Sequence, residues 1–244
     1  MKVHFIQHES FEAPGAYLEW AMARGYQVSF SKVYEYQPLP DEHAIQNLDL
    51  LVILGGPQSP STMQTECPYF DSQAEQTVLK RAIDAGKAVV GACLGAQLIG
   101  EALGAAYEHS PEREIGNFPI RLNRQGLDDP LLSHFGESTV VGHWHNDMPG
   151  LTPNAQILAA SAGCPRQIVK YSALVYGFQC HPELTLDVVR QLIAAQANLV
   201  EQSQQHRFVQ HPDEILLYDY REMNEKLWLF LDRLIEAYRQ TTQN

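Results

Sequence analysis

The chain has 244 residues, of which 45% are hydrophobic, and it carries a formal net charge of -12 at neutral pH. This length and apolar content suit one sizeable α/β domain, with or without an appended segment. The acidic balance gives no electrostatic reason to bind nucleic acid or an anionic membrane, and we expect it mainly to aid solubility. No apolar run approaches the roughly 20 residues that a membrane-spanning helix needs, so no membrane segment is expected.

Four cysteines are spread along the chain, at Cys67, Cys93, Cys164 and Cys180. The segment 1–6, MKVHFI, lacks the long apolar region of a secretory leader. This predicts a cytoplasmic protein whose thiols are reduced. The sequence has no Cys-x-x-Cys pair, so we do not expect a structural zinc site.

The first hundred residues alternate between strands and helices. Strands are expected at residues 2–7, 26–33, 49–54 and 88–92. Helices are expected at residues 14–24, 69–85 and 94–103. The segment 49–54, DLLVIL, is almost continuously apolar, which is typical of a parallel strand covered on both faces. The alternation predicts a doubly wound parallel sheet.

The middle of the chain has a different pattern, with short apolar runs between Gly, Pro and Asn turns. Strands are expected at residues 117–123, 137–143, 156–161 and 167–178. They predict additional, partly antiparallel pairing. Helices return at 184–204 and 213–239, and the polar stretch 201–212 is expected to link to the last helix.

The strongest local signal is the segment 91–97, GACLGAQ. Cys93 lies between an apolar strand and an amphipathic helix and is flanked by small residues, a pattern typical of a nucleophile elbow. Small neighbours let the tight turn form, and the helix N-terminus supplies free N–H groups and a partial positive charge. Both favour a thiolate and an oxyanion. By itself the segment equally fits a buried structural cysteine.

A second signal is the segment 177–183, GFQCHPE, in which a strand ends at His181 and Glu183 follows two residues on. This order suits a histidine that takes the proton from a thiol while a carboxylate orients its ring. The intervening proline disfavours helix at His181 and indicates a sharp exit from the strand. A lone histidine at a strand end would be an ordinary surface residue.

Taken together, these two segments resemble the class I glutamine amidotransferase family. Its pattern is a G-x-C-x-G-x-Q elbow followed about ninety residues later by H-P-E, and here His181 follows Cys93 by 88 residues. The resemblance extends over about residues 48–185. Further matching segments are GGPQS at 55–59 (the oxyanion loop), HWHND at 143–147 (the W-H-x-D segment) and EIG at 114–116 (seen near the amidotransferase part of GMP synthetase).

The resemblance implies roles for the catalytic residues. Cys93 would attack the γ-carboxamide carbon of glutamine. His181 would act as general base and then as general acid to the leaving ammonia, and Glu183 would hold its imidazole in the working tautomer. A water would then hydrolyse the γ-glutamyl thioester. No metal and no organic cofactor is implied.

The resemblance also implies where the substrate binds. The backbone N–H groups of Gly56 and Leu94 would form the oxyanion hole. Gln97, one helical turn after the cysteine, would help to hold the glutamine. Trp144 and His145 would contact the amino-acid end of the substrate through their backbone. Among the other histidines, His4 and His8 are expected in surface or loop positions.

Some residues depart from the family pattern. Cys180 stands where many members have a large apolar residue, and we expect it to serve packing. Gln58 replaces a glycine found in many members, which indicates the GMP synthetase-like subgroup. No second catalytic domain or Walker-type loop is recognisable after Glu183. The chain is therefore interpreted as a free-standing subunit, as a partner of a separate synthetase, or as a hydrolase in its own right.

Two alternatives to a glutamine-hydrolysing enzyme stay open. The first keeps the chemistry but acts on a γ-glutamyl peptide such as a glutathione-like compound. The second is a non-catalytic regulatory or assembly subunit. The apolar residues between Trp228 and Ile235 have helical spacing and predict a helix packed on the domain, or otherwise a surface for a homodimer or another partner.

We therefore expect a flavodoxin-like three-layer α/β sandwich with a mostly parallel central sheet. Residues 1–200 are predicted to form the glutamine amidotransferase-like catalytic domain. Residues 201–244 are predicted to form a C-terminal helical extension packed on the same domain. The site should lie at the carboxyl ends of the strands, where open α/β sheets bind ligands.

Overall fold

The structure is a computed structural model and describes residues 1–242; the last two residues of the predicted extension 201–244 lie outside this range. The strands are β1 (Lys2–Gln7), β2 (Gln27–Lys32), β3 (Leu50–Ile53), β4 (Ala88–Ala92), β5 (Glu108–Leu122), β6 (Ser138–Met148), β7 (Gln156–Ala160), β8 (Ile168–Ser172), β9 (Val175–Phe178) and β10 (Phe208–Val209). The α-helices are α1 (Ala16–Ala23), α2 (Glu42–Asn47), α3 (Ser72–Asp84), α4 (Leu94–Ala102), α5 (Arg124–Asp128), α6 (Leu186–Ala195), α7 (Leu199–Gln205), α8 (Pro212–Leu216) and α9 (Arg221–Thr242). Two short 3-10 helices are η1 (Val33–Glu35) and η2 (Ser133–Phe135).

Within the described residues the strands form one sheet in the order β10-β5-β7-β8-β9-β4-β3-β1-β2, with β6 paired to β5 outside this path. The run from β2 through β1, β3 and β4 to β9 is parallel. From β9 onward the pairs β9–β8, β8–β7 and β7–β5 are antiparallel, as is β5–β6. The α/β fold with a parallel central sheet is confirmed, and so is the antiparallel pairing in the middle of the chain.

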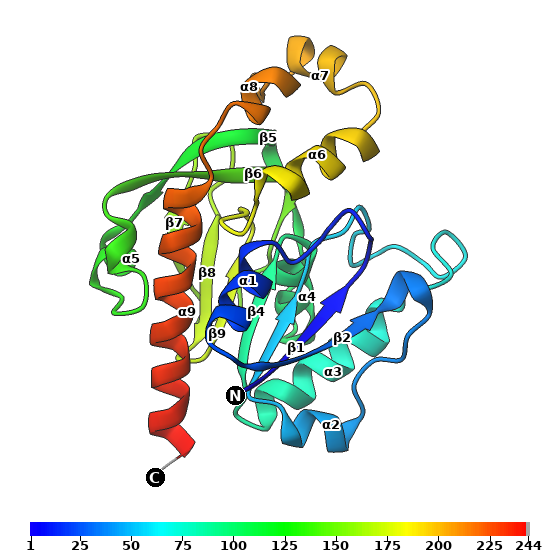
Figure 1. The fold of residues 1–244 in the computed structure, drawn as a ribbon, viewed down its shortest axis with the longest axis vertical. Helices are drawn as coiled ribbons and strands as arrows, with labels where there is room; N and C mark the ends of the chain where they lie inside the picture. The colour runs from blue at the N-terminus through cyan, green and yellow to red at the C-terminus, as the bar shows by residue number, and fades with distance from the viewer. Residues whose placement is uncertain (243–244) are drawn as a thin grey trace.

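The parallel strands are apolar because both faces of the sheet are covered. In β3, Leu50 and Val52 belong to a core cluster with α1 and α9, whereas Leu51 and Ile53 belong to a cluster with α3 and α4. Each such buried side chain stabilises the fold by about 1.5–3 kcal/mol relative to an exposed one. This alternation produces the three layers seen in Figure 1, with α1 and α9 on one face.

The C-terminal helix α9 is part of the main core. Its buried residues, among them Leu227, Phe230 and Leu234, belong to the same cluster as the α1 side of the sheet. Asp232 of α9 accepts a hydrogen bond from Trp20 Nε1 at 2.9 Å and pairs with Arg24 at 2.7 Å. The helix runs alongside the sheet next to α1 (Figure 1).

Several expected boundaries were wrong. The strand expected at 167–178 is a hairpin of β8 and β9, and the helix expected at 184–204 is divided into α6 and α7 by Asn198, which has φ 57°. The helix expected at 213–239 is α8 followed by the separate α9. The stretch 201–212 is more than a link, because β10 lies within it and pairs with β5.

His4 was expected in a surface or loop position but is buried within β1, whereas His8 lies in the loop after β1, as expected, with a buried side chain. His4 lies within hydrogen-bond distance of two serine hydroxyls on β2, at 2.8 and 3.0 Å. The Nδ1 atom of His8 is 2.9 Å from the Gly55 carbonyl oxygen, and its Nε2 atom is 2.9 Å from Glu75 Oε2. These polar partners let both imidazoles sit inside the fold.

Candidate active site

Cys93 occupies a strained turn between β4 and α4. Its backbone has φ 49° and ψ -107°, a left-handed φ that a residue with a side chain rarely adopts. Two glycines make the turn possible. A Cβ atom on Gly91 would lie 2.4 Å from the Gly95 backbone, and one on Gly95 would lie 2.2 Å from the Ile53 carbonyl oxygen. The spacing of small residues around the cysteine therefore follows from close backbone packing.

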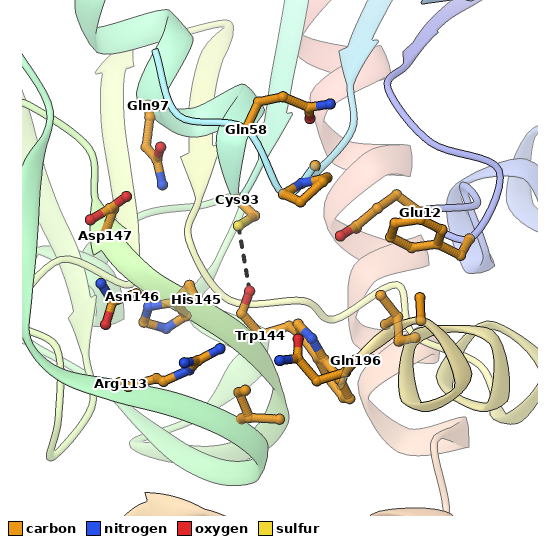
Figure 2. Close-up of a pocket in the computed structure, with 16 residues that line it drawn as sticks. Glu12, Gln58, Cys93, Gln97, Arg113, Trp144, His145, Asn146, Asp147 and Gln196 are labelled. Carbon is orange, nitrogen blue, oxygen red and sulfur yellow. Dashed lines mark hydrogen bonds between the residues drawn. The ribbon is translucent and has the colours of Figure 1, made fainter. Parts of the chain in front are cut away.

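Three neighbours surround the sulfur of Cys93. The thiol donates to the Trp144 carbonyl oxygen at 3.7 Å (Figure 2). Gln179 Nε2 donates to the sulfur at 3.3 Å. His181 is the third neighbour, because the Cys93 side chain acts directly on its imidazole and raises its pKa. The side chain is 7% exposed, so a substrate can reach it only through the adjoining pocket.

His181 and Glu183 form a buried pair, with Nδ1 of the imidazole 2.6 Å from Oε1 of the carboxylate. Burial alone would lower the pKa of His181, but the charge of Glu183 and the neighbouring Cys93 thiol raise it well above its usual value. The Nε2 atom has no hydrogen-bond partner within residues 1–242. It is therefore free to exchange a proton with a reacting group.

The loop after β3 meets the N-terminus of α4 beside the cysteine. A Cβ atom on Gly56 would lie 2.4 Å from Gln58 Oε1, 3.0 Å from His8 Cβ and 3.1 Å from Leu94 Cδ2, so the loop packs closely against its neighbours there. Leu94 is the first residue of α4, so its N–H has no acceptor within the helix. Gly56 and Cys93 both line the same pocket.

That pocket has a volume of about 250 Å³ and extends to both sides of Cys93. Figure 2 shows Gln97, Asp147, Asn146 and Arg113 on one side of the sulfur and Glu12 on the other. The pocket is also lined by Phe11, next to Glu12 in sequence, and by Leu192, Ala195 and Gln196 around the end of α6. The cavity thus has polar side chains at one end, whereas apolar side chains accompany the acidic Glu12 at the other end.

Gln97 and Gln179 are linked behind the sulfur. Gln97 Nε2 donates to Gln179 Oε1 at 3.2 Å, and both amides are buried. Gln97 Oε1 has no hydrogen-bond partner within residues 1–242, and the residue lines the pocket. This buried acceptor can take a hydrogen bond from a bound amine or amide.

Behind the pocket wall, a buried network joins β5 to β6. Glu114 Oε2 lies 3.2 Å from His145 Nε2 and 3.5 Å from His143 Nδ1, close enough for the three side chains to share a metal ion. However, Gln167 Nε2 donates to the same oxygen at 2.6 Å, and the Ser161 hydroxyl donates to the carboxylate at 2.8 Å. Hydrogen bonds thus satisfy this carboxylate, as buried charge requires.

Burial and mutual contacts shift the pKa values of the side chains in this network. Burial lowers the pKa of His143 to about 3, so its ring is neutral at physiological pH. Burial would raise the pKa of Glu114, but its hydrogen bond with His145 and the nearby His143 lower it. The network fixes β6 at the register that brings the Trp144 carbonyl to Cys93, because Ile115 pairs with Trp144.

The residues predicted from the sequence lie together around Cys93. Further residues that were not predicted also border this site. Gln97, Trp144 and His145 all line the pocket, although the His145 ring is held by Glu114. Cys180 is fully buried, and its thiol contacts the Gln167 carbonyl at 3.7 Å. The additional residues are Glu12, Arg113, Asp147, Gln179 and Gln196. Of these, only Asp147 and Gln179 lie inside a recognised motif.

The family model "Glutamine amidotransferase class-I" matches residues 16–200. The chain belongs to this family. It is 54% identical to YfeJ of Salmonella typhimurium, named a glutamine amidotransferase-like protein, over 98% of this chain and all of that protein. The GMP synthase [glutamine-hydrolyzing] of Lachnospira eligens is 29% identical over 64% of this chain, which spans only 28% of that protein.

Among solved structures, SMU.1228c superimposes with a TM-score of 0.94 and 52% sequence identity, over 96% of this chain and 99% of that one. The fold and the family resemblance expected from the sequence are therefore confirmed. No helix of the described residues is long and apolar enough to cross a membrane.

Proposed function

We propose that this protein hydrolyses a γ-glutamyl amide, with glutamine as the reference substrate, through a thioester on Cys93. The observation that carries the proposal is the strained turn that holds Cys93 beside His181, whose other ring nitrogen is 2.6 Å from Glu183. A nucleophile, a base and a group that orients the base are the parts that such chemistry needs.

In the proposed reaction, the Cys93 sulfur attacks the γ-carbonyl carbon while His181 accepts the thiol proton. The carbon–nitrogen bond then breaks, and His181 returns the proton to the leaving nitrogen. A water, deprotonated by the same imidazole, cleaves the thioester and releases glutamate. Overall, one γ-glutamyl amide and one water molecule give one glutamate and one molecule of ammonia or amine.

The remaining expected roles are assigned on the same basis. The N–H groups of Gly56 and Leu94 would stabilise the oxyanion, and loss of one such donor costs on the order of 3–4 kcal/mol of transition-state stabilisation. Gln97 would hold the glutamyl chain. Arg113 and Asp147 line the same end of the pocket and supply counter-charges for an α-carboxylate and an α-ammonium group.

The destination of the nitrogen is a separate proposal. A relative is named as a glutamine-hydrolysing GMP synthase, and this chain matches only 28% of its length. Here the ammonia either passes to a separate synthetase subunit or is released in the cytoplasm. The pocket on the Glu12 side of Cys93 favours the second candidate function, hydrolysis of a substituted γ-glutamyl amide, because it has room beyond the sulfur.

The decisive test is release of glutamate from glutamine and from γ-glutamyl amides by the purified protein and by Cys93→Ala. The variant should lose essentially all activity, whereas Cys67→Ala, which alters a half-buried thiol outside the pocket lining, should keep it. Full activity in Cys93→Ala would exclude the mechanism. A wild-type protein inactive on every γ-glutamyl compound would leave a regulatory or assembly role.

A further inference from the structure

The pocket continues past Cys93 toward Glu12, on the side of the sulfur opposite Asp147 and Gln97. Glu12 lies there, next to Phe11 in the loop between β1 and α1, and the α6 region adds Leu192 and Ala195 to the lining of the pocket. Figure 2 shows Glu12 on the far side of the sulfur from Asp147 and Gln97. This arm of the pocket pairs an apolar wall with one acidic group.

Glu12 lies next to the proposed general base. A Cβ atom built on Gly55 would be 2.7 Å from Glu12 Oε2 and 3.4 Å from His181 Cε1, so one small gap separates the carboxylate from the imidazole. In the proposed reaction, His181 hands its proton to the leaving nitrogen. The nitrogen and whatever it carries must therefore lie on this side of the thioester.

The charged side chains of the pocket also lie at two separate ends, one on each side of Cys93. Glu12 and Arg113 each make no hydrogen bond and no salt bridge within residues 1–242, although both line the cavity. A γ-glutamyl group brings one carboxylate and one ammonium, and Arg113 and Asp147 lie at the other end. The ammonium would share the Asp147 carboxylate with exposed His109, whose Nδ1 is 2.6 Å from Oδ1. No charged group of the γ-glutamyl part is then left to pair with the Glu12 carboxylate.

We propose that the preferred substrates are γ-glutamyl amides whose nitrogen carries an alkyl chain ending in a cation, and that Glu12 binds this cation. The alkyl chain would lie along the apolar lining residues Phe11 and Leu192. The inference rests on the proposed function and specifies its substrate class. Hydrolysis of such an amide gives glutamate and a diamine-like product, with water as the only co-reactant.

The electrostatics of Glu12 agree with this role. Burial raises the pKa of the Glu12 carboxyl and the nearby Glu183 adds to the increase, whereas the charge of His181 lowers the pKa. Burial makes this carboxylate costly even with the charges of His181 and His8 nearby, and a bound cation would reduce that cost. The wall thus favours a cationic ligand over a neutral one.

The experiment compares matched amides on the same enzyme. Each γ-glutamyl amide of an α,ω-diamine is paired with the amide of the n-alkylamine in which a methyl group replaces the terminal ammonium, and glutamine is the common reference. For the best chain length we expect kcat/KM to favour the cationic amide by about 10- to 100-fold, as a hydrogen bond to a charged group predicts.

Glu12→Gln should reduce this ratio to near one, because it removes the carboxylate charge and keeps the size of the side chain. Glu12→Lys should reverse the preference. Glu19→Gln, which changes an exposed glutamate on α1, should leave the ratio unchanged. The ratio is informative because loss of folded enzyme lowers both rates equally.

Equal hydrolysis of cationic and neutral amides by the wild type would overturn the inference, as would an unchanged ratio in Glu12→Gln. Activity on glutamine with no activity on any substituted amide would also overturn it. In each of these cases the proposed function survives, because a γ-glutamyl amide is still hydrolysed through Cys93. Inactivity on every compound would overturn both.

Discussion

The Nδ1 atom of His181 lies 2.6 Å from Glu183 Oε1, and both side chains are buried at the carboxyl end of β9. This hydrogen bond fixes the imidazole with its Nε2 atom directed away from the carboxylate. The carboxylate also supplies the leading favourable charge that raises the pKa of His181. A single short contact therefore controls the orientation and the protonation of the proposed base.

Replacing this carboxylate should disable the base without removing it. In Glu183→Gln we expect kcat to fall by up to about 10⁴-fold, because the amide can stabilise the wrong tautomer and cannot stabilise the imidazolium. The pKa of His181 should also fall, which NMR titration of the ring would reveal. The exposed Glu42→Gln serves as the control. An unchanged pH–rate profile in Glu183→Gln would contradict the assignment.

Gln179 offers a second test at the sulfur itself. Its amide donates to Cys93 Sγ at 3.3 Å, so Gln179→Leu removes a hydrogen bond that would strengthen as negative charge develops on sulfur. We expect alkylation of Cys93 by iodoacetamide to slow by about 10- to 100-fold. Gln191→Leu alters an exposed amide on α6 and should react like the wild type. Equal alkylation rates in all three proteins would show that this contact does not activate the thiol.

The sequence allowed the elbow to be predicted because its requirements are local. Gly91 approaches the Gly95 backbone within one strand-turn-helix unit, and Gly95 in turn approaches Ile53 of β3. Both requirements are met by glycines inside one short motif. The parallel strands were predictable for a similar reason, since burial on both faces leaves an unbroken apolar run such as Leu50–Ile53. The division of α6 from α7 was not, because Asn198 marks the break only through its backbone φ of 57°.

The rest of the pocket depends on contacts between distant segments. Glu12 follows β1 and Arg113 lies in β5, and neither belongs to a recognised motif, although Arg113 directly precedes the EIG segment 114–116. They line the pocket because the sheet order brings their strands to the same end as β4 and β9. The burial of the His8 side chain was not predicted for the same reason, since its partner Glu75 lies in α3 and no periodicity links the two.

The packing of Gly95 leads to a prediction on stability and activity together. A Cβ atom there would be 2.2 Å from the Ile53 carbonyl oxygen, so Gly95→Ala must displace α4 from β3. We expect unfolding free energy to fall by about 1–3 kcal/mol and glutamate release to fall with it, because the turn at Cys93 moves. Chemical denaturation and a glutaminase assay would measure the two effects.

Gly86→Ala is the control for this substitution. Gly86 has a positive φ of 69°, but an added Cβ atom would meet nothing within 4 Å. It should cost about 1–2 kcal/mol of backbone strain and leave catalysis intact. Normal activity in Gly95→Ala would mean that the elbow tolerates movement of α4, contrary to the geometry.

The buried pair of His8 and Glu75 predicts a pH dependence of stability. Burial alone would lower the pKa of His8, but the charge and the hydrogen bond of Glu75 raise it. A raised folded-state pKa means that the stabilisation is fully present below the unfolded pKa of about 6.5 and is lost as pH rises through the folded pKa. Protonated His8 also holds the Gly55 carbonyl, so the effect extends to the loop beside Cys93.

Glu75→Gln isolates this contribution, because other titrating groups are common to both proteins. The wild type should exceed Glu75→Gln in unfolding free energy by up to about 3 kcal/mol just below pH 6.5, and the difference should shrink as pH rises above the folded pKa of His8. Urea denaturation across this range measures the difference, with exposed Glu214→Gln as the control. A difference that stayed constant with pH would mean that His8 is neutral in the folded protein. The hydrogen bond alone, without charge, would then hold the Gly55 loop in place.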